Sequence, residues 1–310
     1  MKINYKKNYK SYPKKIYKTL NKNISQIHIK KKKKIIYKNP KKKNMKEFFI
    51  SFIIGAISCG IGFKYYIWFF SIGYGIAIAA IGIYLLIIFN SILVLETILS
   101  CILFIVYGLR LSIYLGIRES KSSYNDKMKG EIKPTDTISM IAKISIWIAC
   151  SLLYAFMTCP VTFRLMNTNI NSNIDILYRI SLIITLLGII IETLADYQKN
   201  SAKKNNPHRF VDTGLYKIVR CPNYFGELLL WTGVFIGGIN IYYYYYYWIF
   251  SVLGYILIIY VMFSGARRLE IRQNKSYSDD NEYQEYVKNT PIIIPLIPIY
   301  SVEKYSFLVA

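Results

Sequence analysis

Five ionisable side chains lie within or at the edges of strongly apolar stretches of the sequence: Glu96, Arg110, Glu192, Asp196 and Glu227. A charged group at membrane depth is costly, so such residues indicate function by default. Arg110 and Tyr114 are four residues apart and project from one helical face, and Glu192 and Asp196 share a face in the same way. We expect these groups to serve a binding or catalytic site. The alternative is that they pair with one another or reach the membrane surface.

A denser polar region spans residues 192–231. Two carboxylates leave an apolar segment, and we predict a loop carrying Lys199, Lys203, Lys204, His208 and Arg209. Pro222 suits the first turn of the next helix, where its missing N–H costs nothing. Cations on a loop beside free helix N-terminal amides predict a binding site for a pyrophosphate or another anionic cofactor. An ordinary basic membrane-flanking loop explains the lysines, but not the string Arg-Cys-Pro-Asn-Tyr-Phe-Gly-Glu at 220–227.

The elements that must position these residues are membrane helices. The 310-residue chain is 54% hydrophobic, and its mean hydropathy is +0.27. Several apolar runs approach the 17–25 residues that cross a bilayer. The sequence therefore predicts an all-α, polytopic bundle of about seven membrane helices, followed by an amphipathic tail over 264–310. The predicted segments are 47–63, 66–89, 91–117, 138–160, 176–195, 225–239 and 241–263, the sixth being short enough to be tilted or only partly spanning.

We divide the chain into a basic low-complexity arm (1–46) and a transmembrane domain (47–310). The arm holds 18 of the 40 basic residues and no acid, so we expect it to be disordered in isolation. It is either a targeting segment or a low-complexity extension. Positive charge after the first, third and fifth segments and in the tail predicts an outer N-terminus and an inner C-terminus. The arm contradicts that topology unless it is removed or translocated, or unless the number of membrane segments differs by one from the seven predicted. We expect the endoplasmic reticulum or an organellar membrane.

Several classes of site find no support in the sequence. The five cysteines form no Cys-x-x-Cys or Cys/His cluster, so neither a zinc site nor a disulfide framework is indicated. Two histidines are too few for a His-rich diiron site. Neither a Rossmann glycine motif nor a P-loop occurs. We predict no metal and no nucleic-acid partner, and the sequence does not indicate the oligomeric state.

The string at 220–227, followed by Trp231 and Gly233, resembles the C-terminal motif of steroid 5α-reductase-like membrane proteins. The most similar branch is largely uncharacterised and has Arg-His-Pro-Asn-Tyr-Phe-Gly-Glu. Three further blocks agree in order, so the resemblance covers roughly 91–300. These blocks are Leu-Arg-Leu-Ser-Ile-Tyr at 109–114, Glu-Thr-Leu-Ala-Asp-Tyr-Gln-Lys at 192–199, and a tail block containing Ser264, Gly265, Leu269, Glu270, Tyr283 and Tyr286.

The resemblance implies a seven-helix bundle that holds NADPH on its inner side. It implies reduction of a C=C bond, usually conjugated to a carbonyl, in a lipid such as a steroid, a polyprenyl chain or a fatty-acyl chain within the bilayer. An acid or hydrogen-bond donor would polarise the carbonyl, and depth and side-chain chemistry favour Glu96, Arg110 and Tyr114 for that role. The cofactor-binding positions that the resemblance implies are Asp196, Arg220, Asn223, Tyr224, Glu227, Glu270, Tyr283 and Tyr286.

Cys221 stands where that branch has the motif histidine, which removes an imidazole donor and base. Two other functions stay open, and Cys221 bears on the second of them. One is an S-adenosylmethionine-dependent membrane methyltransferase of the isoprenylcysteine or phospholipid type, whose Arg-His-Pro-x-Tyr-x-Gly string is similar. The other is a non-catalytic membrane protein on the same scaffold. The Asn-Tyr-Phe-Gly-Glu form and the upstream Asp-x-Gln segment favour the reductase.

Overall fold

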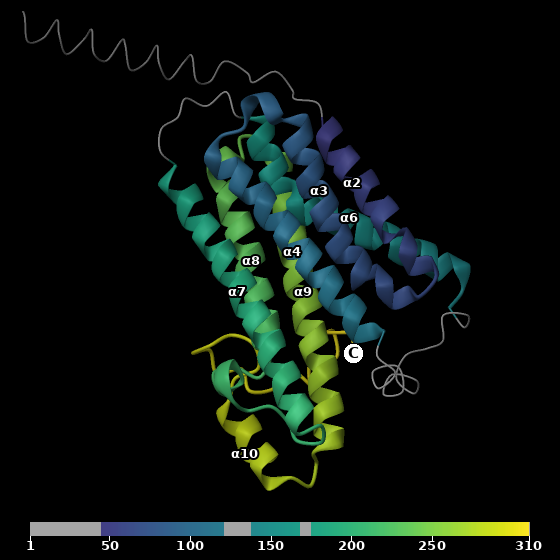
Figure 1. Ribbon diagram of the computed structural model, residues 1–310, viewed down its shortest axis with the longest axis vertical. Coiled ribbons are helices and arrows are strands. Elements are labelled where there is room, and N and C mark those ends of the chain that lie inside the picture. Colours follow the sequence, from purple (N-terminus) through teal and green to yellow (C-terminus); the bar gives the residue numbers. More distant parts are fainter. Residues whose placement is uncertain (1–44, 121–137, 168–174, 310) are drawn as a thin grey trace, which may run out of the picture. The chain divides into compact units, whose positions relative to one another are not determined.

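The computed structural model describes residues 45–120, 138–167 and 175–309, which form an all-α bundle (Figure 1). The predicted fold class is confirmed. The predicted basic arm lies almost entirely outside the described residues. In chain order the α-helices are α2 (Lys46–Cys59), α3 (Ile72–Ile88), α4 (Leu95–Glu119), α6 (Met140–Met166), α7 (Ile176–Asn205), α8 (Pro222–Gly238), α9 (Tyr245–Ser276) and α10 (Asn281–Asn289).

Seven of the described helical segments are long and apolar enough to cross a membrane. The sixth, expected to be short, is Pro222–Ile241, because α8 continues into a 3₁₀ turn. Its 20 residues match the length that a span needs. Pro222 occupies the first turn of α8, as the sequence predicts.

Three helices run further than predicted, and one of them is α6, which continues from the expected end at 160 to Met166. The α7 helix continues from the expected end at 195 to Asn205, and α9 continues from 263 to Ser276. The prediction that Lys199, Lys203 and Lys204 lie on a loop is therefore wrong, because all three belong to α7. Hydrophobicity marks where a helix leaves lipid, but lysine is a good helix former. Basic groups in the last turn also complement the helix dipole.

Glycines bring neighbouring helices into backbone contact. A Cβ added to Gly226 of α8 would lie 2.6 Å from the backbone nitrogen of Glu192 on α7. A Cβ added to Gly75 of α3 would lie 2.5 Å from the carbonyl oxygen of Gly108 on α4. Small residues at such crossings let membrane helices approach closely. The α7–α8 contact therefore places the Glu192 turn directly beside the turn that carries Glu227.

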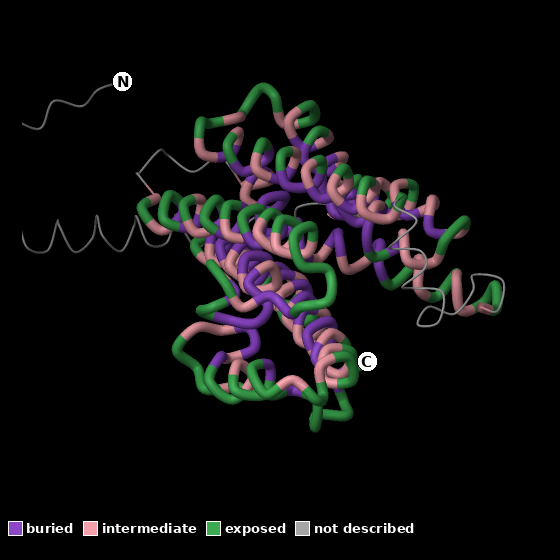
Figure 2. The backbone as a smooth tube through the Cα atoms, turned by 60° about the horizontal axis from the view of Figure 1, so that its bottom comes forward, coloured by how far each residue is buried: buried purple, intermediate pink, exposed green. Residues whose placement is uncertain are grey.

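The outer surface of the bundle is apolar. Figure 2 shows buried positions along the inside of the helices and exposed positions along their outer faces. Large exposed side chains include Ile113 of α4, Ile183 of α7 and Ile256 of α9, each more than half exposed. In water such a surface would be an aggregation hazard, whereas in a bilayer it contacts lipid.

Candidate active site in the membrane

Arg110 of α4 forms ion pairs with two carboxylates of α7. Its Nη1 lies 2.8 Å from Oδ2 of Asp196, and its Nη2 contacts Oε1 of Glu192. The Glu192 side chain is 5% exposed and that of Asp196 is 11% exposed. The two acids lie one turn apart on one face of α7, as their spacing predicts, so one guanidinium reaches both. This arrangement neutralises part of the buried negative charge and joins two helices that are distant in sequence.

Glu227 of α8 lies in a second polar group in the bundle core. The Tyr74 hydroxyl of α3 donates a 2.8 Å hydrogen bond to Oε1 of Glu227. The same hydroxyl accepts hydrogen bonds from Nε1 of Trp231 at 2.8 Å and from the Tyr107 hydroxyl at 3.1 Å. All four side chains are buried. Trp231 is one turn beyond Glu227 on α8, so both reach the same hydroxyl.

Tyr107 joins the two groups. It lies three residues before Arg110 on α4, and the Arg110 guanidinium carbon is 5.8 Å from the centroid of the Tyr107 ring. The combined set, named here the intramembrane cluster, draws its residues from α3, α4, α7 and α8. Its members are Tyr74, Tyr107, Arg110, Glu192, Asp196, Glu227 and Trp231.

Sequence reasoning missed Tyr74 and Tyr107 as members of this site. Tyr107 shares a helical face with Arg110, which is a signal that the sequence contains. Tyr74 has no such neighbour, because its partners lie on other helices. With 30 tyrosines in the chain, a tyrosine inside an apolar segment is not distinctive.

A second buried ion pair lies where α8 begins. Nη2 of Arg220 is 2.8 Å from Oε1 of Glu270 on α9, and the two side chains are 2% and 1% exposed. The same Arg220 nitrogen donates to the carbonyl oxygen of Tyr300, while Oε2 of Glu270 accepts from the Val302 N–H at 2.8 Å. Arg220 and Glu270 were both predicted as cofactor-binding residues, and the structure brings them together.

Arg220 retains unused hydrogen-bonding capacity. Its Nε and Nη1 are buried and make no hydrogen bond within the described part of the protein. Tyr283 lies close to this guanidinium, but its hydroxyl donates to Oδ1 of Asn274 at 2.7 Å. A buried guanidinium with unpartnered donors favours an anionic ligand, because an unmade charged hydrogen bond is costly.

The predicted tail tyrosines pack beside this pair. The Tyr286 hydroxyl donates to the Tyr216 carbonyl oxygen at 2.6 Å, and the Tyr286 ring stacks on Phe210 with 5.3 Å between centroids. Burial raises the pKa of Tyr283 to about 12, so its phenol stays neutral and able to donate at physiological pH. Tyr283 also lines a hollow of about 240 Å³ between the end of α9 and α10.

The first turn of α8 carries the remaining predicted cofactor residues. Asn223 and Tyr224 are both half-buried, and a Cβ added to Gly265 of α9 would lie 3.2 Å from the Tyr224 hydroxyl. Just before this turn, burial raises the pKa of the Cys221 thiol to about 11, and the charges of Lys199 and Arg220 oppose the shift. Cys221 is therefore a neutral thiol near pH 7.

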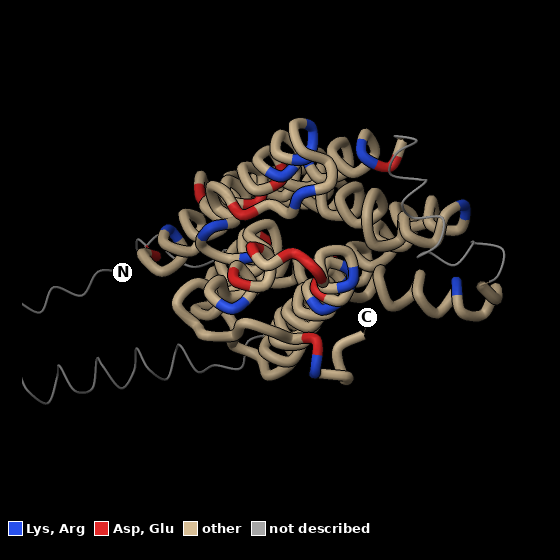
Figure 3. Tube along the Cα trace, turned by 90° about the horizontal axis from the view of Figure 1, so that it is seen from below, with Lys and Arg blue, Asp and Glu red and all other residues tan. Residues whose placement is uncertain are grey.

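Two of the five cations expected to make an anion-binding site, Lys203 and Arg209, contact protein groups. Lys203 donates to the carbonyl oxygens of Pro207 and Arg209 and, at 2.9 Å, to the Tyr277 hydroxyl. Arg209 pairs with Asp212 at 2.9 Å and with Glu282 at 2.6 Å. Figure 3 shows Lys and Arg interspersed with Asp and Glu across the described chain.

Two of the three predicted catalytic residues lie outside the intramembrane cluster. Glu96 is in the first turn of α4, fourteen residues and so roughly 21 Å along the helix from Arg110. There it pairs with Arg179 at 2.8 Å. Tyr114 lies one turn beyond Arg110, where the Arg118 guanidinium carbon is 5.9 Å from its ring centroid. Of the three, the structure places only Arg110 in the cluster.

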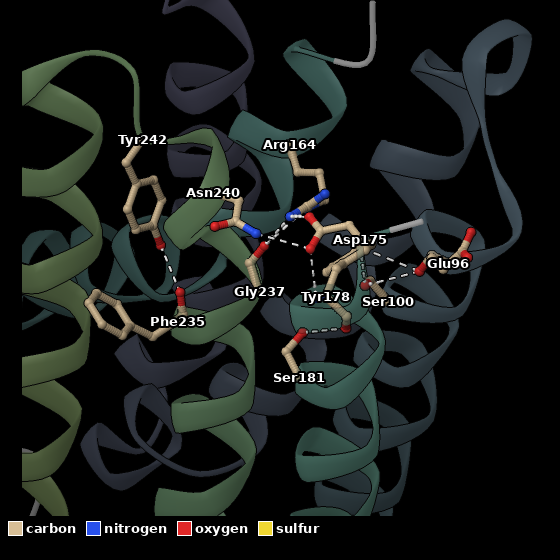
Figure 4. A network of polar contacts seen from close by, with 10 residues as sticks. All are labelled: Glu96, Ser100, Arg164, Asp175, Tyr178, Ser181, Phe235, Gly237, Asn240 and Tyr242. Atoms are coloured by element: carbon tan, nitrogen blue, oxygen red, sulfur yellow. Dashed lines mark hydrogen bonds and ion pairs between the residues drawn. The ribbon is translucent and has the colours of Figure 1, made fainter. Parts of the chain in front are cut away.

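Glu96 belongs to a polar network at the opposite end of the bundle (Figure 4). Arg164 of α6 donates to Oδ2 of Asp175 and to the Gly237 carbonyl oxygen of α8, both at 2.7 Å. Its guanidinium carbon lies 3.8 Å from the centroid of the Tyr178 ring. The Tyr178 hydroxyl lies 2.5 Å from Oγ of Ser100 on α4. It also donates to the Glu96 carbonyl oxygen at 3.3 Å, so the network ties α4, α6, α7 and α8 together.

Comparison with known proteins assigns the chain to a family. The family described as "protein of unknown function (DUF1295)" matches residues 65–290. The protein belongs to this family. No curated protein and no solved structure matches the chain.

The DUF1295 region contains the side chains of both buried sites. It begins just before α3 and ends just after α10, so it includes the intramembrane cluster and the Arg220–Glu270 pair. It excludes α2 and the segment after 290, whose backbone nevertheless contacts Arg220 and Glu270 through Tyr300 and Val302. The side chains of both sites thus lie within the matched residues, and part of the backbone that contacts them lies outside the match.

Proposed function

We propose that this DUF1295 protein is a membrane-embedded, NADPH-dependent reductase of a C=C bond conjugated to a carbonyl in a lipid. The observation that carries the proposal is the intramembrane cluster, which places carboxylates, phenols and a guanidinium among apolar helices. The resemblance of residues 220–227 and of three further blocks to steroid 5α-reductase-like proteins supports the same reaction. A bilayer-facing exterior suits a substrate that dissolves in lipid.

Residues of the cluster supply the acid side of such a reduction. The reaction adds a hydride to one carbon and a proton to its neighbour, while a donor polarises the carbonyl oxygen. In the proposed mechanism the Tyr107 hydroxyl, which donates to Tyr74 in the absence of substrate, turns to donate to that oxygen, while Tyr74 remains hydrogen-bonded to Glu227. Arg110 holds Glu192 and Asp196, keeps Tyr107 beside a positive charge, and favours developing negative charge on the substrate.

Residues near the start of α8 fit an anionic dinucleotide. NADPH, when bound, supplies the hydride for the reduction. Nε and Nη1 of Arg220 are unpartnered donors suited to a phosphate. Asn223 and Tyr224 lie on the adjacent turn, and the hollow at Tyr283 has an aromatic wall with Tyr277. We assign Arg220, Asn223 and Tyr224 to holding the cofactor, with Glu270, Tyr283 and Tyr286 supporting them.

The first test is ligand binding to the purified full chain in detergent. A ligand that binds only the folded state raises its melting temperature, so NADPH, NADH and S-adenosylmethionine are compared. We expect stabilisation by NADPH alone. Stabilisation by S-adenosylmethionine would overturn the proposal in favour of a membrane methyltransferase. No shift with any of the three would favour a non-catalytic protein.

A matched pair of variants tests the cofactor assignment. Asn223→Ala removes a half-buried amide on the first turn of α8 and should weaken the NADPH-dependent rise in melting temperature. Asn206→Ala removes an exposed amide at the end of α7 and should leave the NADPH-dependent rise in melting temperature unchanged. Equal shifts for both variants would remove Asn223 from the site. The melting temperature without ligand shows whether each variant is folded.

A further inference from the structure

The segment after α10 contains a run of ten residues without a charged side chain. Residues 291–300, named here the proline loop, read Pro-Ile-Ile-Ile-Pro-Leu-Ile-Pro-Ile-Tyr and contain no Asp, Glu, Lys or Arg. Charged residues flank the loop on both sides: Lys288 precedes it, and Glu303 and Lys304 follow it. Connections that face water ordinarily carry polar residues. Ten uncharged residues therefore need a physical explanation.

The base of the proline loop is packed into the protein. Ile292 and Ile293 are buried at 1% and 0% exposure. Two backbone hydrogen bonds close the base of the loop. The Ile292 N–H donates to the carbonyl oxygen of Ile299 at 2.8 Å, and the Ile299 N–H donates to the carbonyl oxygen of Ile297 at 2.7 Å. The side chains of the base thus belong to the core, and those of the tip do not.

The tip of the loop presents apolar side chains outward. Leu296 is 99% exposed, and Ile297 is 44% exposed. Leu296 is also the only non-glycine residue with a positive φ, +65°, among the described residues. A left-handed conformation is unfavourable for leucine, so the chain accepts local strain where it also exposes a large apolar side chain. Solvent alone favours neither feature.

Backbone hydrogen bonds locate the loop relative to the membrane. The N–H groups of Arg220 and Cys221 donate to the carbonyl oxygens of Pro291 and Ile292, at 2.9 and 2.8 Å. Cys221 immediately precedes Pro222, the first residue of the sixth candidate span. The loop therefore begins at the level where α8 enters the membrane. Figure 1 shows the chain turning back from α10 toward the lower parts of α7 and α8.

The geometry points to the bilayer interface as the partner of this tip: we propose that residues 295–298 insert into the headgroup–acyl boundary beside the start of α8. Four residues reach at most about 14 Å, which suffices for a shallow insertion. Pro295 and Pro298 have no N–H, so the tip carries fewer donors that would lose water on entering lipid. Their fixed φ angles also reduce the conformational entropy lost on insertion.

The chemistry of the tip predicts an insertion that does not depend on lipid charge. Basic segments bind anionic lipids through charge, and salt weakens that attraction. The proline loop has no cation to make such contacts, so apolar burial must drive its insertion. Anchoring the tip also restrains Tyr300 and Val302, which contact Arg220 and Glu270. The inference does not depend on the proposed reductase activity.

Site-specific labelling tests the proposal in the full-length protein. All five cysteines are buried, so Leu296→Cys introduces an accessible thiol for an environment-sensitive fluorophore. The matched control is Glu285→Cys, at an exposed position on α10. Both labelled proteins are reconstituted into phosphatidylcholine vesicles. Lipids with a nitroxide high on the acyl chain report shallow insertion, and iodide reports exposure to water.

We expect the Leu296 fluorophore to be quenched several-fold more by the lipid nitroxide than the Glu285 fluorophore, and to emit at shorter wavelength. Addition of salt or of anionic lipid should leave both differences in place. Iodide should quench the Glu285 fluorophore more strongly. Equal iodide quenching at the two positions, with no lipid quenching at Leu296, would overturn the proposal. Unchanged melting temperatures show that labelling has not unfolded either variant.

Discussion

Tyr74 donates a 2.8 Å hydrogen bond to Glu227 across 153 residues of sequence. Tyr74 lies on α3 and Glu227 on α8, and both are buried. The Tyr74 hydroxyl donates its one proton to the Glu227 carboxylate and accepts hydrogen bonds from Trp231 and Tyr107. A phenol with all three positions satisfied is rigidly oriented. It therefore holds Glu227 in one position within the bundle core.

Removing the Tyr74 hydroxyl should destabilise the folded protein. In Tyr74→Phe, Glu227 loses a donor and Trp231 loses its acceptor, and we expect a loss of about 1–3 kcal/mol in the free energy of unfolding. Thermal or denaturant unfolding in detergent measures the change. Tyr243→Phe is the control, because Tyr243 is 61% exposed and should change stability by less than about 0.5 kcal/mol. Equal effects would show that the hydrogen bonds at Tyr74 contribute nothing.

Arg110 and Arg179 offer a matched comparison of ion pairs. Arg110→Ala leaves Glu192 and Asp196 buried without a cation, and we expect a loss of about 3–5 kcal/mol in folding stability. Arg179→Ala breaks a pair whose arginine side chain is 53% exposed, and we expect about 0–1 kcal/mol.

The stability of both arginine variants is measured by denaturant unfolding in detergent. Arg110→Lys should lose less folding stability than Arg110→Ala but should still be less stable than the original protein, because an ammonium group cannot contact both carboxylates as a guanidinium does. If Arg110→Ala is as mild as Arg179→Ala, the Arg110 ion pairs do not hold α4 against α7.

Close backbone contact between α7 and α8 should make Gly226 intolerant of any side chain. The added methyl group of Gly226→Ala would lie 2.6 Å from the Glu192 backbone nitrogen, so the helices must separate and the protein should lose about 1–3 kcal/mol. Gly116→Ala on α4 is the control, since nothing lies within 4 Å of its added Cβ. That variant should be neutral or up to about 1 kcal/mol more stable. The melting temperature of Gly226→Ala should therefore fall, and that of Gly116→Ala should stay the same or rise.

The buried thiol of Cys221 predicts an alkaline loss of stability. Folding raises its pKa from 9.0 to about 11, so the unfolded chain loses this proton first as pH rises. The stabilising contribution is complete below pH 9 and is lost progressively between pH 9 and 11, by on the order of 2 kcal/mol. Tyrosines titrate in the same range, so the measurement is the difference between the original protein and Cys221→Ala. A difference that does not change with pH would show that Cys221 is not buried as a neutral thiol.

The sequence by itself determined the membrane class, the all-α fold, the seven spans and the pairs of residues that share a helical face. Segment length, mean hydropathy and the spacing of Glu192 and Asp196 are local properties, and the helix repeat converts them directly into structure. The same local information misplaced the ends of α7 and α9. Hydropathy marks the edge of the lipid, and polar helix formers carry a helix beyond it.

Only the tertiary structure decided which buried polar groups meet. Nothing in the sequence pairs Tyr74 with Glu227, or pairs Arg110 with Glu192 and Asp196 while Glu96 pairs with Arg179. Those relationships depend on which helices pack together and at what depth. Backbone contacts at glycines such as Gly226 set that packing, and the buried hydrogen bonds then select one register. Partner choice across helices is a property of the assembled bundle, because each group must satisfy its hydrogen bonds among whatever groups the packing brings near it.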